Sequence, residues 1–201
     1  MTIAPANPLL PSNTLPNHLY SFMIKIEKAT LSDAEILSNL AKAIYQENYL
    51  HLWLPGGADW YMNQYAYSIH QIEKELADPN NAYYLLQDNQ EPVGYLKLVL
   101  CSNLNGYDPD NALEIERIYL LENRKGKGLG KKMMQLAMDA ALALNKKVIF
   151  LKAMDSSQEA IAFYQHQGYS ICDTFSLPMP SFALMKESYR GMLILSRLLN
   201  H

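Results

Sequence analysis

A turn rich in glycine and lysine is the segment best suited to bind an anion. Residues 124–132 read Arg-Lys-Gly-Lys-Gly-Leu-Gly-Lys-Lys, so glycines alternate with basic side chains. Glycines between a strand and a helix leave backbone N–H groups free to converge on an anion, and the helix dipole adds about half a positive charge there. We therefore predict a phosphate-binding loop, followed by a helix whose apolar residues from Leu129 to Leu144 share one face.

The order of residues in this turn argues against two other phosphate-binding motifs. A P-loop ends in Gly-Lys followed by Ser or Thr, whereas Gly130 is followed by Lys131 and Lys132. A Rossmann turn has the pattern Gly-x-Gly-x-x-Gly, but this turn reads Gly-x-Gly-x-Gly. The remaining alternative is a solvated basic loop in which the glycines serve only for turning.

Two carboxylates precede the turn on a predicted strand. Glu114 and Glu116 are two residues apart, so both point to one face of a strand at 113–120. A carboxylate in a cleft can accept a proton from an amine, directly or through water. Either glutamate is therefore a candidate base, and the alternative is a surface pair that faces cations such as Arg117.

Aromatic residues crowd the segment from Tyr45 to Tyr67. Trp53, Trp60 and Tyr61 could form a wall against which a cationic amine packs, so they are candidate substrate-binding residues. The alternative is that these rings belong to the core and to a helix interface.

The composition limits the partners of this chain. It has 201 residues, with 17 Lys and Arg against 20 Asp and Glu and a formal net charge of −3. That balance gives no global attraction to nucleic acid or to an anionic membrane, so we expect neither partner. No apolar run reaches the ~20 residues of a membrane span, and two cysteines are too few for a disulfide framework. We expect a cytoplasmic protein, and no metal, because His51, His70 and His166 show no ligand spacing.

The elements that would position these residues alternate along the chain. Four prolines within residues 1–22 predict a flexible N-terminal arm, and residues 23–201 are predicted to form a single domain. Strands are predicted at 24–29, 82–87, 93–100, 113–120, 147–152, 169–175 and 182–189, and helices at 32–49, 59–76, 129–144 and 157–167. Short loops demand antiparallel neighbours and strand–helix–strand passages demand parallel ones, so the fold class is α/β, an α+β sandwich with a mixed sheet.

Two motifs resemble those of the GNAT superfamily of N-acetyltransferases. The acetyl-CoA-binding motif of that family, Gln/Arg-x-x-Gly-x-Gly/Ala, is similar to residues 125–130, with Lys125 in place of the first residue. Residues 160–169, Ala-Ile-Ala-Phe-Tyr-Gln-His-Gln-Gly-Tyr, are similar to the Ala-Ile-x-x-Tyr-x-x-x-Gly-Phe motif. Ser157 stands where the family commonly has Asn. The resemblance extends over residues 23–189, and segments 116–120 and 73–80 weakly resemble the polyamine and small-amine branch.

The resemblance implies a fold, a cofactor and a reaction. The fold would be GNAT-like, with a mixed, mostly antiparallel central sheet flanked by helices. The activity would be transfer of an acetyl group from acetyl-CoA to a primary amine of a small molecule, polyamine-like or amino-acid-like, by direct attack. The alternatives are a protein or peptide N-acetyltransferase and a non-catalytic acyl-CoA-binding regulatory domain. The family also suggests a homodimer.

The resemblance also implies roles for individual residues. Tyr164 would protonate the thiolate of CoA, and Glu114 or Glu116 would relay the proton of the amine. Backbone groups around Ile118 and Leu120 would bind the acetyl carbonyl and the pantetheine arm. The implied cofactor-binding residues are Ile118, Tyr119, Leu120, Lys125, Gly126, Lys127, Gly128, Leu129, Gly130, Lys131 and Ser157.

Overall fold

A computed structural model describes residues 24–199, and the predicted N-terminal arm lies outside this range. The described residues form a seven-stranded sheet in the order β1-β2-β3-β4-β5-β7-β6. Its strands are β1 (Ile24–Lys28), β2 (Asn81–Asp88), β3 (Glu91–Val99), β4 (Ala112–Leu120), β5 (Val148–Met154), β6 (Ser170–Ser176) and β7 (Gly191–Leu198). The helices are α1 (Ala34–Asn48), α2 (Gly57–Trp60), α3 (Ile69–Ala77), α4 (Leu129–Ala143) and α5 (Gln158–His166).

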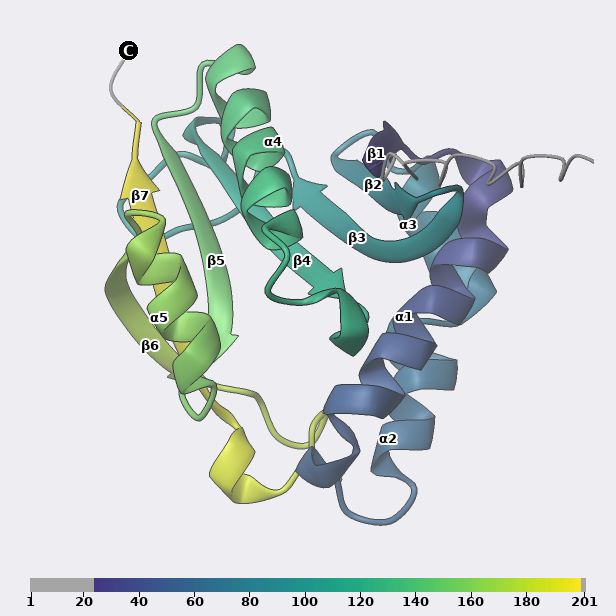
Figure 1. The fold of residues 1–201 in the computed structure, drawn as a ribbon. Helices are drawn as coiled ribbons and strands as arrows, with labels where there is room; N and C mark the ends of the chain where they lie inside the picture. The colour runs from purple at the N-terminus through teal and green to yellow at the C-terminus, as the bar shows by residue number, and fades with distance from the viewer. Residues whose placement is uncertain (1–23, 200–201) are drawn as a thin grey trace, which may run out of the picture.

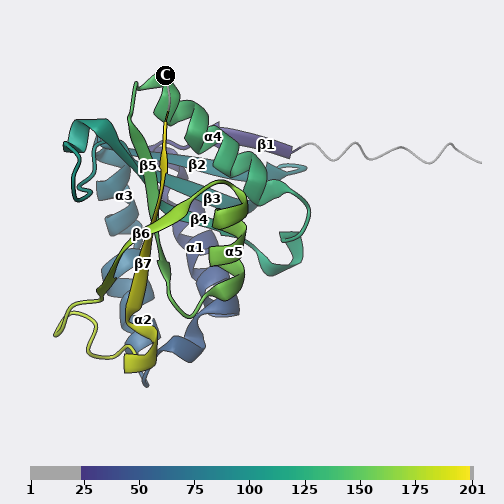
Figure 2. The same ribbon diagram turned by 90° about the vertical axis from the view of Figure 1, so that its left-hand side faces the viewer.

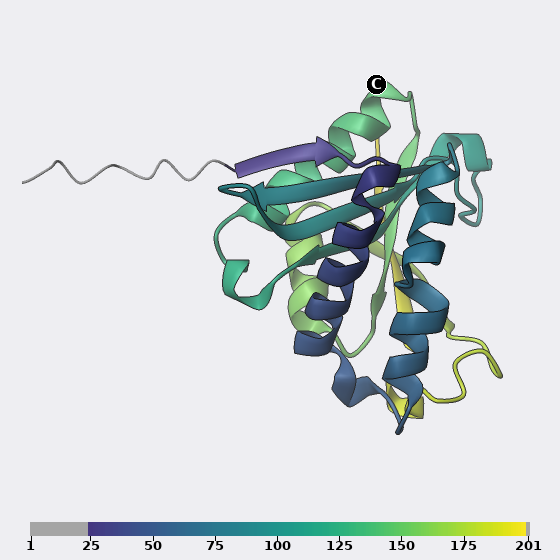
Figure 3. The same cartoon turned by 90° about the vertical axis from the view of Figure 1, so that its right-hand side faces the viewer.

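The helices cover both faces of the sheet. Figure 3 shows α1, α2 and α3 in front of the sheet with α4 and α5 behind it, and Figure 2 gives the view from the opposite side. The two large clusters of buried residues in the described part of the chain lie on opposite faces, because neighbouring strand residues point to opposite faces, and a small third cluster surrounds Phe150. Leu85 and Tyr95 pack under α1 and α3, whereas Leu86 and Leu96 pack under α4. None of the helices within residues 24–199 has the length and apolar content needed to cross a membrane.

A single parallel pair, β4 with β5, interrupts an otherwise antiparallel sheet. This arrangement confirms the predicted mixed, mostly antiparallel sheet. The β2–β3 connection is a tight hairpin in which Asn89 and Gln90 both have positive φ, as a two-residue turn requires.

Strands β4 and β5 pair over only part of their length and then diverge. Their pairing runs from Ala112 with Val148 to Ile115 with Leu151. Beyond that point β4 continues beside β3 and β5 continues beside β7, so the sheet opens into a fork (Figure 1). A bulge lies at the base of the fork, because Lys97 pairs with Arg117 and Leu98 pairs with Ile115.

Two sequence expectations for the elements were wrong. The last strand is Gly191–Leu198, and the predicted strand at 182–189 is part of a loop. Strand β7 lies between β5 and β6 and pairs antiparallel with both. Its residues 192–195 are all apolar, so no alternation marks them as a strand. The predicted helix at 59–76 is three pieces, α2, a π-helical segment (Tyr61–Ala66) and α3. The remaining predicted elements are confirmed within a few residues.

The loop between β6 and β7 closes the open end of the fork. Leu54 N donates to Leu184 O at 2.8 Å, and Lys186 N donates to Leu52 O at 2.9 Å. The ring of Phe182 lies 6.4 Å from that of Trp53. The β6–β7 loop therefore meets the segment between α1 and α2, as the lower part of Figure 1 shows.

Candidate active site

A cavity of about 510 Å³ occupies the fork. Its wall comes from both arms of the fork, the glycine-rich turn, the start of α4, α5 and the C-terminal end of α1. Residues in the wall that bear on chemistry are Tyr49, Glu116, Ile118, Tyr119, Leu120, Lys125, Gly126, Gly128, Gly130, Lys131, Lys152, Met154, Ser157, Glu159, Tyr164 and Met192. The structure thus brings most of the sequence-predicted cofactor residues to one place.

The glycine-rich turn is shaped to receive a ligand close to its backbone. Gly126 and Gly128 have φ of +73° and +76°, a conformation that other residues adopt only with strain. A Cβ built on either glycine would meet nothing within 4 Å, so open space lies over the turn. Gly128 is the N-cap of α4, and within residues 24–199 no backbone hydrogen bond is donated by the amides of 126–131. The turn therefore presents unused donors to an anion.

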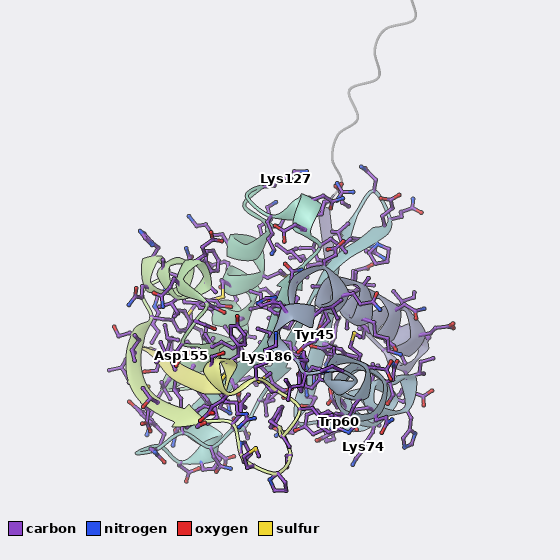
Figure 4. The ribbon with its side chains drawn as sticks, turned by 90° about the horizontal axis from the view of Figure 1, so that it is seen from below. Tyr45, Trp60, Lys74, Lys127, Asp155 and Lys186 are labelled. Carbon is purple, nitrogen blue, oxygen red and sulfur yellow. The ribbon has the colours of Figure 1, made fainter. Side chains whose placement is uncertain are left out.

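Some basic side chains near the turn line the cavity, and others lie outside its wall. Lys125 and Lys131 line the cavity, and Lys125 Nζ lies 2.7 Å from Asn48 Oδ1 and also pairs with Glu122. Lys127 is exposed at the edge of the molecule in the view from below (Figure 4). The Leu129 side chain packs in the core under α4, so neither Lys127 nor Leu129 contributes its side chain to the cavity wall.

Arg124 serves the scaffold instead of the cavity. Its Nη1 lies 2.6 Å from Asp88 Oδ2 and its Nη2 lies 3.4 Å from Glu91 Oε2. Arg124 therefore ties the turn to the β2–β3 hairpin.

The outer part of β4 offers backbone groups to the cavity. Ile118, Tyr119 and Leu120 all line it. One edge of this segment pairs with β3, and beyond Ile115 the other edge has no partner among the described strands. Unpaired N–H and C=O groups of a strand can bind an extended ligand as an added strand would.

Tyr164 reaches the cavity from α5. Its ring lies 5.4 Å from that of Phe163 and 6.5 Å from that of Tyr169. Burial raises the pKa of Tyr164 above its usual value, and the nearby Tyr49 raises it further. The phenol therefore stays protonated at physiological pH and is available as a proton donor. Ser157 caps α5 without a side-chain hydrogen bond to the helix and also lines the cavity.

Glu114 and Glu116 have different surroundings. Glu116 lines the cavity, whereas Glu114 is buried outside its wall. Ser102 Oγ donates to Glu114 Oε2 at 2.7 Å, and Lys152 Nζ lies 2.9 Å from Glu114 Oε1. Of the two predicted bases, Glu116 is the one whose carboxylate faces the cavity.

A buried network of charges holds Glu116. Lys97 Nζ lies 2.8 Å from Glu116 Oε2 and 3.0 Å from Glu75 Oε2. Arg117 contacts the same two carboxylates, with its Nη1 2.8 Å from Glu75 Oε2 and its Nη2 3.2 Å from Glu116 Oε1. Burial alone would raise the pKa of Glu75, but Arg117, Lys97 and hydrogen bonds from Tyr83 and Gln71 lower it to about 2.

Sequence reasoning missed Glu75, Lys97 and Lys152. A signal existed for Lys97, because a lysine inside the apolar run of a predicted strand must find a buried partner. Its partners come from α3 and β4, and no spacing in the sequence marks them.

The structure corrects the predicted substrate contacts of Trp53, Trp60 and Tyr61. These rings pack into an aromatic core with Tyr45 and Phe182 and do not line the cavity. Trp53 is only 5% exposed, and its Nε1 donates to the Tyr45 hydroxyl at 2.8 Å. Trp53 lies in an extended segment bridged to Met185, and Trp60 and Tyr61 are half-buried on the helical segments that follow.

Two other tyrosines supply the aromatic part of the cavity wall. They are Tyr49, at the end of α1, and Tyr119, on β4, and their ring centroids are 5.9 Å apart. Among residues 24–199 no three metal-ligating side chains come together.

Comparison with known proteins points to one family. Residues 42–169 match the family model described as the acetyltransferase (GNAT) family. An uncharacterised N-acetyltransferase from Lactobacillus delbrueckii is 35% identical over 94 residues, which are 47% of this chain and 54% of that protein. The uncharacterised N-acetyltransferase YjgM of Escherichia coli is 29% identical over 106 residues, 53% of this chain and 61% of that protein. The matched region thus spans a little over half of each relative.

Solved structures share the fold. The PaiA N-acetyltransferase from Thermoplasma acidophilum, solved in complex with coenzyme A, superposes with a TM-score of 0.69 at 15% identity, covering 88% of this chain and 99% of that one. A spermidine N-acetyltransferase from Vibrio cholerae gives 0.62 at 14% identity, covering 87% and 93%. A ribosomal-protein-alanine N-acetyltransferase from Brucella melitensis gives 0.65 at 18% identity, covering 87% and 99%. The names of the last two proteins state different acceptors, spermidine and an alanine of a ribosomal protein.

Proposed function

This chain belongs to the GNAT family of acetyltransferases, and we propose that it transfers the acetyl group of acetyl-CoA to a primary amine of a small molecule. The observation that carries the proposal is the cavity in the fork, which joins the glycine-rich turn, Tyr164 and Glu116 in one space. The positive φ and the open space at Gly126 and Gly128 fit a diphosphate lying against the turn.

The proposed cofactor site uses the turn and the free edge of β4. The amides of 126–131 hold the diphosphate, and the Lys125 and Lys131 side chains balance its charge. The backbone around Ile118 and Leu120 binds the pantetheine arm and the carbonyl oxygen of the thioester. When bound, acetyl-CoA supplies an activated acyl group.

Tyr164 acts on the leaving sulfur, and Glu116 acts on the attacking amine. A neutral amine attacks the carbonyl carbon, a C–N bond forms, and the C–S bond breaks as the sulfur takes the electron pair. The Tyr164 phenol, kept protonated by its environment, gives its proton to that sulfur. Glu116 accepts a hydrogen bond from the amine, and the proton that the amine loses leaves through water. Lys97 and Arg117 hold the Glu116 carboxylate in place, so it can orient the attacking amine.

The closed end of the fork favours a small acceptor. The β6–β7 loop is hydrogen-bonded to Leu52 and Leu54, so its backbone bridges that end of the fork. The cavity wall there is largely apolar and aromatic, as Tyr49, Tyr119 and Met154 show. A protein or peptide acceptor is the second candidate. It is supported by the ribosomal-protein-alanine N-acetyltransferase from Brucella melitensis, which has the same fold.

The proposal is tested by release of the CoA thiol and by the mass of the product. Purified protein is mixed with acetyl-CoA and either small primary amines or peptides with a free N-terminus. We expect thiol release and an N-acetylated product with a small amine, above the hydrolysis measured without acceptor. Turnover of peptides alone would reject the small-molecule acceptor, and binding of acetyl-CoA without any turnover would favour a regulatory acyl-CoA-binding domain.

A further inference from the structure

The two arms of the fork begin with side chains of opposite charge. The last β4–β5 pair is Ile115 with Leu151, so Glu116 and Lys152 are the first residues after the strands part. Both line the cavity, and their side chains are 31% and 37% exposed. Backbones of paired strands are about 4.8 Å apart and these diverge, so a small molecule can lie between the carboxylate and the ammonium.

Each of these two side chains retains bonding capacity. Glu114 occupies one of the three N–H donors of the Lys152 ammonium, and no other contact of that ammonium with a polar atom is found among the described residues. The Glu116 oxygens contact Lys97 and Arg117, but each carboxylate oxygen has two lone pairs. The fork can therefore bind an N–H group on one arm and an anion on the other.

The buried charges around the base of the fork balance one another. The carboxylates of Glu75, Glu114 and Glu116 are matched by three cations, Lys97, Arg117 and Lys152. The cavity wall adds one further carboxylate, Glu159. Outside the wall, Asp155 and Glu187 are offset by Lys186 and Arg190, and Figure 4 labels Asp155 and Lys186 in the view from below. A polyamine carries several positive charges and needs a marked excess of carboxylates, whereas the wall holds Glu116 and Glu159 together with Lys125, Lys131 and Lys152.

Taking the proposed function as its basis, we propose that the acceptor is an amino acid or a similar molecule with one amine and one carboxylate. Glu116 binds the amine and Lys152 binds the carboxylate. The remaining wall is apolar, with Met154 and Met192 paired across β5 and β7 and with Tyr119 on β4, so an apolar side chain fits there. Lys152 is the residue that determines this specificity.

The test compares amines that differ only in the carboxylate. L-methionine, L-leucine and L-phenylalanine are each measured against their carboxamides, with spermidine alongside, by release of the CoA thiol. A charged hydrogen bond is worth about 1.5–3 kcal/mol, so kcat/KM for at least one amino acid should exceed that of its carboxamide by roughly tenfold or more. Lys152→Gln should abolish this preference mainly through KM, and Lys152→Arg should retain it.

Two controls separate specificity from folding. Lys147→Gln removes an exposed lysine just before the same strand, outside the cavity wall, and should leave the preference unchanged. The double variant Glu114→Gln/Lys152→Gln avoids leaving a buried carboxylate without its cation and should also lose the preference. Circular dichroism verifies that each variant is folded.

Several outcomes would overturn the inference. They are equal use of acids and carboxamides, better use of spermidine, or an unchanged preference in Lys152→Gln. Calorimetry of the same amino acids, with the protein saturated in CoA, tests the carboxylate site without any need for turnover. The affinity for the amino acid should weaken in Lys152→Gln. Absence of thiol release with every amine would refute the proposed activity, and this binding measurement would still confirm or reject the carboxylate site.

Discussion

Lys97 Nζ lies 2.9 Å from Glu116 Oε1 and 2.8 Å from Glu116 Oε2, so one ammonium contacts both oxygens of the carboxylate in the cavity. The same ammonium lies 3.0 Å from Glu75, and its side chain is only 4% exposed. Because a buried ammonium is costly without partners, the two glutamates hold it in place and it fixes them in turn. The charge network thereby ties the cavity wall to α3.

This network should make the stability of the protein depend on acid through Glu75. Its pKa is lowered in the folded state from 4.5 to about 2, so the associated stability is present above pH 4.5 and is lost as the pH falls toward 2. The loss attributable to Glu75 should reach up to about 3 kcal/mol. Urea unfolding between pH 6 and pH 2 measures it.

Glu75→Gln is the comparison for that titration. We expect the variant to be less stable at pH 6 by about 3–5 kcal/mol, because two buried cations lose a partner. Its free energy of unfolding should fall less steeply below pH 4.5, by up to about 1.4 kcal/mol per pH unit, the slope of one proton. Parallel curves for the two proteins would contradict the role of Glu75.

Removal of the Tyr164 hydroxyl should slow the chemical step. Tyr164→Phe is expected to lower kcat by about 100-fold or more, the usual size of a general-acid contribution, with acetyl-CoA affinity unchanged within a few-fold. Tyr169→Phe is the matched control, because the Tyr169 hydroxyl is buried without a hydrogen-bond partner among residues 24–199 and is not in the cavity wall. That control should keep its kcat and gain slightly in stability. Equal kcat values for Tyr164→Phe and wild type would remove Tyr164 as the acid.

The raised pKa of Tyr164 predicts the alkaline side of the pH profile. A phenol whose pKa lies above its usual value of about 10 stays protonated up to that pH. We therefore expect kcat to stay level between about pH 8 and pH 10, after subtraction of acetyl-CoA hydrolysis. A fall of kcat with an apparent pKa below 10 that is absent from Tyr164→Phe would contradict this assignment.

An acidic side chain in the glycine-rich turn should abolish cofactor binding. Gly128→Asp places a side chain and a negative charge in the open space over the turn. Gly106→Asp is the matched control, because Gly106 also has a positive φ, +85°, and open space around it but lies in the β3–β4 loop. Calorimetry with acetyl-CoA should show binding lost in the first variant and kept in the second. Equal affinities would exclude the turn as the diphosphate site.

Local signals in the sequence were sufficient for most of the fold. Alternation, capping residues and turn residues located six of the seven strands and the long helix after the glycines. These local signals failed where tertiary packing determines the secondary structure. The apolar run 191–198 becomes a strand only because β5 and β6 lie on either side of it, and residues 61–66 form a π-helical segment within an expected α-helix.

Some residues of the candidate site could likewise be predicted from the sequence, and others could not. The turn at 125–131 and Tyr164 could be predicted, because their chemistry depends on adjacent residues in one segment. Lys152 could not be predicted, since its position in the cavity depends on where β4 and β5 part. The tryptophans were misplaced because an aromatic cluster has the same pattern whether it faces a cavity or a core.

Calorimetric titration of the purified protein with acetyl-CoA, followed by addition of amines to the same sample, tests the central claim most directly. The account predicts saturable binding at one site per chain and release of the CoA thiol when an accepted amine is added. Absence of binding would contradict it, because the cavity in the fork would then not hold the acyl donor.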